Sequence, residues 1–282
     1  MKKLAYSLGA FLIAGTIFFA CKKDKKEVDN ETQTVADNAL CEQEFMRMGP
    51  AVSERAVSTP GVKKVLPGFF TTFSTCASDS LTGSTSVDAN GNFYTDSIPT
   101  LTLDWGTGCV DVDGVSRSGK LSTTFTKPFS KIGSVMTITP IDYKVGNVIY
   151  SGVIQVTRLD TGEFSSFRTQ VINGHCKTAN WDIDWITDKT IRYTAGYNTS
   201  TPDDDVIEIS GTSSGKNRES RSFSVTVKTP LQKKANCKFI SKGSVEIIPD
   251  GLKARTVDFG NGDCDNIGTF TVSGNTFTFT MQ

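Results

Sequence analysis

The chain has 282 residues, of which 30 are basic and 30 are acidic, so its formal net charge is zero. A near-neutral chain without a basic block lacks the electrostatic footprint of a nucleic-acid-binding protein. The frequent glycine (25) and phenylalanine (18), together with abundant threonine and serine, favour strands and turns over helices.

The first 20 residues have the features of a secretory signal peptide. Met1-Lys2-Lys3 supplies a basic start, and an apolar run follows from Leu4 to Phe19. This run is shorter than the roughly 20 apolar residues that a spanning helix needs. We therefore predict that residues 1–20 are removed, which would leave 28 basic and 30 acidic residues.

Ala20-Cys21, followed by Lys22-Lys23-Asp24, resembles the lipobox of bacterial lipoproteins. In that family the cysteine is lipidated and becomes the first residue of the mature protein. The resemblance implies that Cys21 is a lipidation site and that the protein is anchored to the outer membrane. The sequence leaves open whether it faces the periplasm or the cell surface. Residues 21–38 are charged and poor in apolar side chains, which indicates a flexible tether.

One segment has a helical pattern. Apolar residues recur at near-helical spacing from Val35 to Met46, which predicts a helix from Thr34 to about Met48. Gly49-Pro50 is expected to end this helix, because the residue before a proline avoids the helical region. A second short helical stretch is expected near 52–57, so residues 39–66 are interpreted as a helical or irregular N-terminal segment.

From residue 67 to residue 282 the apolar residues alternate with polar ones, which is typical of strands. We count a dozen strands or more, joined mostly by short turns. This pattern predicts an all-β domain in which an antiparallel meander forms a sandwich or a curled barrel, since a flat sheet that wide leaves a face and its edges open. Val148–Val156 is apolar on both faces, which predicts a central strand that is covered on both sides.

An internal repeat spans residues 76–109 and 237–264. Each unit opens with a cysteine and ends with an aspartate, an aromatic residue, two spaced glycines and a second cysteine. We interpret each unit as a hairpin that is closed near its base by its own disulfide. The predicted bonds are Cys76–Cys109 and Cys237–Cys264.

Six cysteines remain once Cys21 is assigned to lipid, which is an even number in an exported chain, where disulfides persist. Cys41 and Cys176 are left over after the two repeat pairs, and we infer their pairing for that reason. Metal ligation is not expected, because the chain has no C-x-x-C motif and a single histidine, His175.

Three features together resemble uncharacterised exported lipoproteins of Bacteroidota-type bacteria. They are residues 18–24, the Asp104-to-Cys109 motif followed by Arg117-Ser118-Gly119-Lys120, and Cys237 with residues 258–265. The resemblance covers most of residues 70–282. It implies an exported, anchored protein and carries no catalytic residues over to this chain.

Apolar residues alternate with two acids from Trp181 to Trp185. If the face of Trp181 and Trp185 is exposed, it is a stacking platform for sugars; the alternative is that both rings pack in the core, opposite a solvated face. Asp182 and Asp184 would lie about 7 Å apart on one strand, within the range of an inverting glycosidase pair. However, both point the same way, whereas catalytic carboxylates flank a bond from two sides.

Other motifs have simpler interpretations than catalysis. His175 and Cys176 are neighbours, which on a strand point to opposite faces, and we expect them at a loop tip after Asn173-Gly174. Residues 211–215 fit the nucleophile-elbow pattern, but a charged loop follows instead of a helix, which favours a hairpin tip. The aspartates at 88, 111, 113 and 203–205 lack a complete calcium loop, and we interpret them as turn residues.

These observations favour a membrane-anchored, non-enzymatic module for binding or envelope structure, without a cofactor. The alternatives are a carbohydrate-binding or glycan-processing accessory protein, and a hydrolase whose site no motif reveals. The expected partners are the membrane, through the lipid anchor, and a glycan or an envelope protein.

Overall fold

The computed structural model describes residues 29, 31–56, 76–111, 113–160, 162, 164–199, 203–237 and 239–281. These residues form one α-helix and 14 β-strands. In chain order the elements are α1 (Gln33–Ala56), β1 (Ser78–Thr82), β2 (Thr100–Asp104), β3 (Cys109–Val110), β4 (Ser116–Phe125), β5 (Val135–Val145), β6 (Val148–Arg158), β7 (Ser166–Lys177), β8 (Asp182–Ala195), β9 (Val206–Lys216), β10 (Ser222–Lys234), β11 (Lys242–Pro249), β12 (Arg255–Asn261), β13 (Ile267–Val272) and β14 (Asn275–Thr280).

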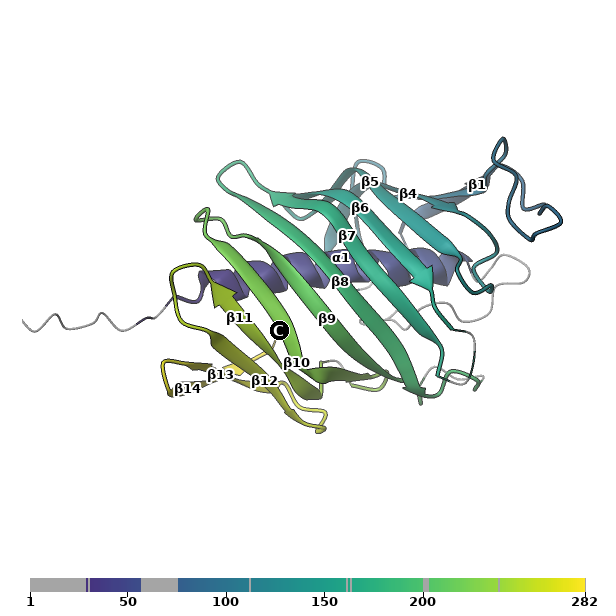
Figure 1. Ribbon diagram of the computed structural model, residues 1–282. Helices are drawn as coiled ribbons and strands as arrows, with labels where there is room; N and C mark the ends of the chain where they lie inside the picture. The colour runs from purple at the N-terminus through teal and green to yellow at the C-terminus, as the bar shows by residue number, and fades with distance from the viewer. Residues whose placement is uncertain are drawn as a thin grey trace, which may run out of the picture.

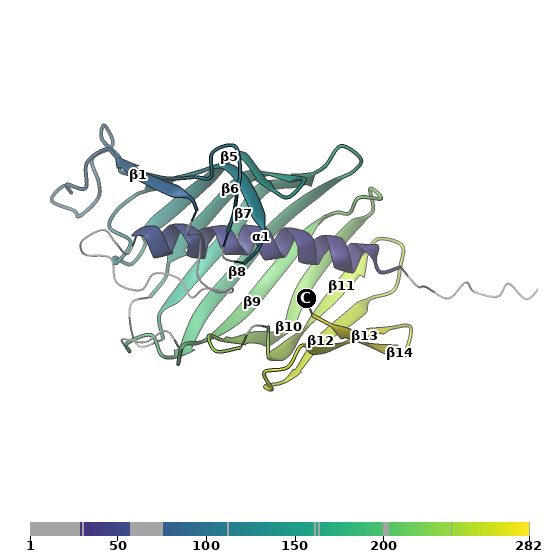
Figure 2. The same cartoon turned by 180° about the vertical axis from the view of Figure 1, so that it is seen from behind.

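The strands form one antiparallel meander, as the sequence predicts. Their order in the sheet is β1-β2-β4-β5-β6-β7-β8-β9-β10-β11-β12-β13-β14, with β3 paired to β4 outside this path. The described strands leave the sheet open, with β1 at one edge and β14 at the other. Figures 1 and 2 show that the sheet curls around α1, so that its concave face and the helix share one core.

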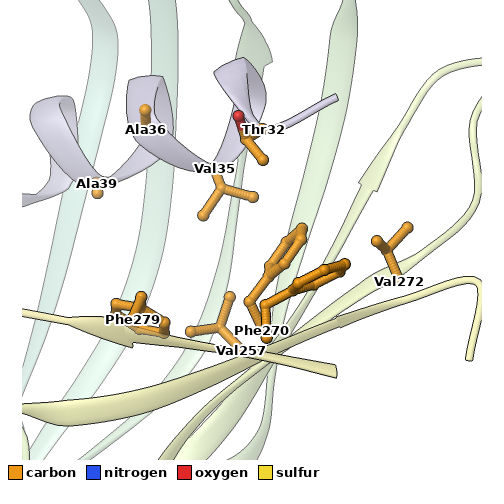
Figure 3. Close-up of a pocket in the computed structure, with 9 residues that line it drawn as sticks. Thr32, Val35, Ala36, Ala39, Val257, Phe270, Val272 and Phe279 are labelled. Carbon is orange, nitrogen blue, oxygen red and sulfur yellow. The ribbon is translucent and has the colours of Figure 1, made fainter. Parts of the chain in front are cut away.

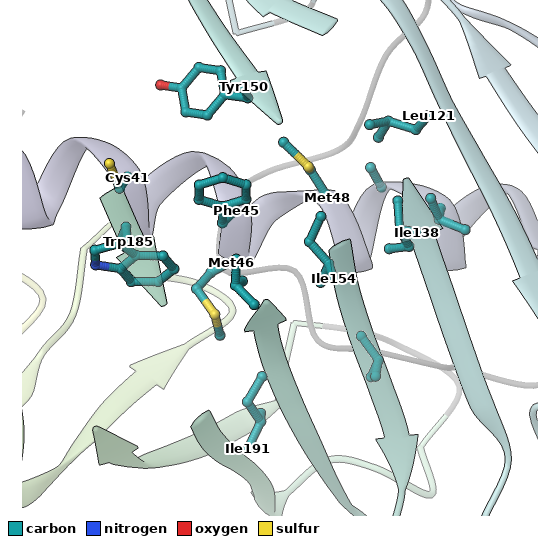
Figure 4. Close-up of a cluster of buried hydrophobic side chains, with 14 of the residues drawn as sticks. Cys41, Phe45, Met46, Met48, Leu121, Ile138, Tyr150, Ile154, Trp185 and Ile191 are labelled. Carbon is teal, nitrogen blue, oxygen red and sulfur yellow. The ribbon is translucent and has the colours of Figure 1, made fainter. Parts of the chain in front are cut away.

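The helix crosses the concave face through an apolar stripe. Cys41, Phe45, Met48 and Val52 recur at i, i+4, i+7 and i+11, and all four side chains are fully buried against the sheet. The Phe45 ring stacks on Trp185 of β8, with centroids 5.6 Å apart and planes 3° from parallel. Figure 4 shows this cluster between the helix and the strands. Each such side chain contributes about 1.5–3 kcal/mol when buried.

The predicted end of the helix at Gly49-Pro50 is wrong, because α1 continues through Pro50 to Ala56. Proline in a helix interior removes one hydrogen bond and costs about 3 kcal/mol. Ala51 and Val52 are fully buried beyond it, so packing against the sheet offsets that cost. The second helical stretch, expected near 52–57, is therefore the last part of α1. The helix also begins at Gln33, so residues 33–38 belong to it and not to the tether.

Polar contacts also hold the helix in the sheet. Tyr143 donates a hydrogen bond of 2.7 Å to the buried carboxylate of Glu44. Trp185 Nε1 donates one of 2.9 Å to Asn38 Oδ1. Lys189 forms an ion pair with Glu42, and Arg218 of the β9–β10 turn forms another with the buried Asp37. Because buried polar groups need their partners, these contacts fix the position of the helix along the sheet.

Both disulfides predicted from the repeat are confirmed, Cys76–Cys109 and Cys237–Cys264. The first closes the β1–β2 hairpin and the second closes the β11–β12 hairpin.

The two repeat motifs also share a local geometry. The carboxylates of Asp104 and Asp258 each accept a hydrogen bond of 2.8 Å from the backbone N–H two residues later. All four motif glycines, at 106, 108, 260 and 262, have positive φ angles. The repeat is therefore a repeated turn structure as well as a repeated sequence.

The expectation that Val148–Val156 is covered on both sides is wrong. The segment lies in β6, which is central in the sheet order. Val148, Tyr150, Ile154 and Val156 are buried on the concave face, whereas Ile149 on the other face is partly exposed. No helix of the described residues covers the convex face.

Candidate functional site

A groove opens between the N-terminal part of α1 and the last strands of the sheet. Its volume is about 570 Å³. It is lined by Thr32, Val35, Ala36 and Ala39 on the helix side and by Val257, Phe270, Val272, Phe277 and Phe279 on β12–β14. Figure 3 shows Val35 and Ala39 on the side of the helix that faces the phenylalanine side chains.

The sequence produces this gap by placing small residues on the helix. Ala36 and Ala39 are exposed, although the following part of α1 is buried. Alanine is too short to fill the distance to β12–β14, so the helix contacts the central strands closely but leaves space here.

The phenylalanine wall comes from a tight hairpin. Ser273 and Gly274 join β13 to β14 with φ angles of 55° and 82°, the combination that two-residue hairpins favour. Alternation along β14 then places Phe277 and Phe279 on one face, and Phe270 pairs with Phe277 across the strands, with ring centroids 6.3 Å apart. Phe277 is 51% exposed, so a ligand could cover it without disturbing the core.

An ion cluster fixes the helix entrance beside this wall. Arg255 of β12 is fully buried, and its Nη2 lies 2.6 Å from Asp29 Oδ1 and 3.2 Å from Glu31 Oε2. Glu31 also accepts a hydrogen bond of 2.6 Å from the backbone N–H of Thr34, in the first turn of α1. The start of the helix is therefore held against β12, one of the strands that line the groove.

The predicted stacking residues do not form an exposed platform. Trp185 is fully buried in the contacts described above, so its ring is closed to a ligand. Trp181 is half-buried, and the guanidinium of Arg218 lies 4.4 Å from its ring centroid. Trp105 is also buried, where its Nε1 donates a hydrogen bond to Asp111. Of the two predicted stacking residues, Trp185 therefore lies in the core and Trp181 lies half-buried against it.

His175 lies inside β7 and not at the expected loop tip. Its Nδ1 lies 2.9 Å from Asp184 Oδ1, and its Nε2 lies 3.9 Å from Asp182 Oδ2, on the convex face. Cys176 is fully buried on the opposite face, as alternation along a strand predicts. Within the described residues no hydroxyl or thiol group is hydrogen-bonded to His175, so this cluster has no positioned nucleophile. Sequence reasoning missed the contact because it depends on the pairing of β7 with β8.

The elbow-like segment 211–215 lies within β9, so the expected hairpin tip is also wrong. The tip of this hairpin is formed by residues 217–220, where Asn217 accepts a hydrogen bond from the backbone N–H of Ser220. Ser213 Oγ lies 2.9 Å from Thr187 Oγ1 and is buried. A strand in this position cannot present a nucleophile as the elbow motif requires.

Two of the aspartates proposed as turn residues, Asp88 and Asp204, accept hydrogen bonds within their turns. Asp88 Oδ1 accepts hydrogen bonds from the backbone N–H groups of Asn90 and Asn92. Asp204 accepts one from the Thr199 hydroxyl. In the described part of the chain, no three acidic, histidine or cysteine side chains gather in a way that could hold a metal ion.

Asp111 and Asp113 belong to a buried ion network around Arg117. Arg117 Nη1 lies 3.0 Å from Asp111 Oδ2 and 2.9 Å from Asp113 Oδ1, and Arg47 of α1 also contacts Asp113. Burial raises the pKa of Asp113, but the hydrogen bonds from Arg117 and the Val115 N–H, with the charge of Arg47, outweigh it and lower the pKa to about 2. This network joins the helix to the first repeat unit and has a structural role.

The predicted lipidation site, Cys21, lies outside the described residues. Within those residues, no helix combines the length and the apolar character needed to cross a membrane. The groove was not predicted, although the alternating Phe277-Thr278-Phe279 pattern was the available sign of a phenylalanine face. In comparisons with known proteins, this chain matches no family model, no curated protein and no solved structure.

Proposed function

We propose that this protein is an exported, lipid-anchored binding module that takes an apolar ligand into the groove between α1 and β12–β14. The observation that carries the proposal is the composition of the groove. Eight of its nine lining residues are apolar, and the ninth is Thr32. Its volume falls within the range of about 300–1,000 Å³ that is typical of ligand pockets.

Burial of apolar surface would drive such binding. Each Å² of apolar surface removed from water contributes about 25 cal/mol, and the three phenylalanine rings offer flat surfaces to a ligand. The lining supplies no carboxylate, imidazole, amine or thiol. Acid–base or nucleophilic chemistry therefore has no side chain to perform it in the groove, which supports a binding role without turnover.

The anchor in this proposal rests on the sequence at Cys21 and on its position ahead of α1. Residues 22–31 separate Cys21 from Thr32, which lines the groove. An extended chain spans at most about 3.6 Å per residue, so this length limits the distance from the anchor to the groove to about 40 Å. The ligand would then be taken up close to the membrane surface.

The groove is tested by titration with the fluorescent apolar probe N-phenyl-1-naphthylamine. The protein for this assay starts at residue 22, because the helix, the sheet and the core all lie within residues 29–281. Wild type should show a saturable rise in fluorescence. Ala39→Phe, which fills the groove, should weaken binding by about tenfold or more.

The matched control is Gln43→Phe, one turn further along α1, at an exposed position that does not line the groove. It should bind the probe within about twofold of wild type. Absence of saturable binding to wild type, or equal loss of binding in both variants, would refute the groove as the binding site.

The anchor is tested separately by detergent phase partitioning of the full-length protein. Wild type should enter the detergent phase, and Cys21→Ser should stay in the aqueous phase. A wild-type protein that stays in the aqueous phase would refute the anchor and leave the groove proposal standing.

A further inference from the structure

The edge strand β14 has no residue that would discourage pairing with another strand. It is the last strand of the sheet, and its sequence Asn-Thr-Phe-Thr-Phe-Thr contains no charge and no proline. Its pairing with β13 runs from Val272↔Asn275 to Ile267↔Thr280 without a bulge. Natural proteins usually protect such an edge with lysine, proline or a bulge, because unpaired backbone groups bind other strands.

The sequence of β14 is also symmetric. Residues 276–280 read Thr-Phe-Thr-Phe-Thr in both directions, with Thr278 at the centre. If two copies pair antiparallel about Thr278, Phe277 of one copy lies opposite Phe279 of the other. Directly opposite residues share a face of the sheet, so all four rings would lie on the concave side. A two-fold interface requires this kind of self-complementary surface.

We propose that a second copy of this chain pairs with β14, through antiparallel strands related by a two-fold axis at Thr278. The proposal rests on the edge and not on the ligand of the groove. In the dimer, the phenylalanine walls of the two grooves meet at the axis, and the exposed half of Phe277 is covered. The threonine side chains lie together on the convex face, where their hydroxyl groups can pair across the strands.

The other edge of the sheet does not offer an equivalent partner. β1 carries Asp79, which lies 3.5 Å from Arg55 of α1, so this edge is charged and already contacts the helix. A β14–β1 contact would join copies head to tail, which gives a ring or an open filament and not a two-fold pair. The absence of charge on β14 and its internal symmetry favour the closed pair.

Crosslinking of the full-length protein in membranes tests the axis. Thr278→Cys places two thiols opposite each other in the dimer, within reach of a short bis-maleimide reagent. We expect a band of twice the monomer mass at about tenfold the wild-type level. The control is Thr212→Cys, an exposed threonine on the central strand β9, which should not exceed the wild-type level. Equal crosslinking of both variants, or none in a folded Thr278→Cys protein, would overturn the proposal.

A charge swap at the same position gives a second test. Two copies of the chain that carry different tags are expressed together. Protein is purified through one tag, and the amount of the copy with the other tag is measured as the recovery. When both copies carry Thr278→Lys, or both carry Thr278→Glu, recovery should fall by about fivefold, since like charges would meet at the axis. The mixed Lys and Glu pair should restore recovery to near the wild-type level. Thermal unfolding should show that each variant is folded, because residue 278 is exposed and points away from the groove. Wild-type recovery for the like-charged pairs would overturn the proposal.

Discussion

The sulfur atoms of Cys41 and Cys176 lie 2.7 Å apart, and both side chains are completely buried between α1 and β7. The structure records them as thiols, in contrast to the two bonded pairs. The contact joins residues that are 135 positions apart in the chain. These are the two cysteines that belong to neither repeat disulfide. The helix and the sheet therefore meet at a position where a third disulfide can form.

We predict that Cys41 and Cys176 are bonded in the exported protein. Peptide mapping under non-reducing conditions should find the linked peptides, and alkylation of the unfolded protein should find no free thiol at either position. On the chain-entropy model, the double substitution of both cysteines by serine should lower the free energy of unfolding by roughly 5 kcal/mol. Burial raises the pKa of the Cys176 thiol, so if the bond were absent the native thiols would react slowly. Alkylation of both thiols after unfolding would contradict the prediction.

Gly119 and Gly114 give a matched test of backbone packing. Both have positive φ angles, of 83° and 77°. A Cβ atom at Gly119 would lie 2.2 Å from the backbone oxygen of Asp142, whereas one at Gly114 would meet nothing within 4 Å. Gly114→Ala should therefore cost only about 1–2 kcal/mol of backbone strain. Gly119→Ala should add overpacking of about 1–3 kcal/mol to a similar strain. Urea unfolding of both variants measures this difference, and equal stabilities would argue against the close approach of β4 and β5.

The Asp113 ion network should make stability dependent on pH. Since the pKa of Asp113 is lowered to about 2 in the folded protein, from 3.8, its contribution is present above about pH 4 and is lost as the pH falls toward 2. The full contribution is about 2 kcal/mol. Asp113→Asn should be less stable at pH 7 and should lose less stability than wild type between pH 5 and pH 3. Parallel pH profiles for the two proteins would show that Asp113 does not contribute.

The two tryptophans of β8 and its preceding turn should differ in their effect on stability. Trp185→Ala removes a fully buried ring together with its stacking on Phe45, and should cost about 3–5 kcal/mol. Trp181→Ala removes a half-buried ring under Arg218 and should cost about 1 kcal/mol. Urea unfolding measures both. In addition, iodide should quench Trp181 fluorescence but not that of Trp185. Similar quenching of both would contradict the assignment of Trp185 to the core.

The strands and the repeat were predictable because they depend on neighbours in the chain. Alternation of apolar and polar residues is a local property, so it predicted the all-β class and the meander. The Asp104 and Asp258 turns place a carboxylate on the N–H two residues later, and that geometry depends only on a few consecutive residues. The two repeat disulfides followed because each one closes a hairpin of adjacent strands.

The sequence by itself determined the strand periodicity, the turns and the two repeat disulfides, while the leader and the lipid site stay predictions from it. Tertiary structure decided the rest, for two physical reasons. Burial depends on how the sheet curves: α1 continues through Pro50 because its far end packs in the concavity, and Trp185 is buried while Trp181 is not. Contacts across strands depend on register and on the path of the helix. For this reason only the folded chain brings His175 to Asp184, places the Cys41 and Cys176 sulfurs 2.7 Å apart and opens a groove between Ala39 and the phenylalanines of β13 and β14.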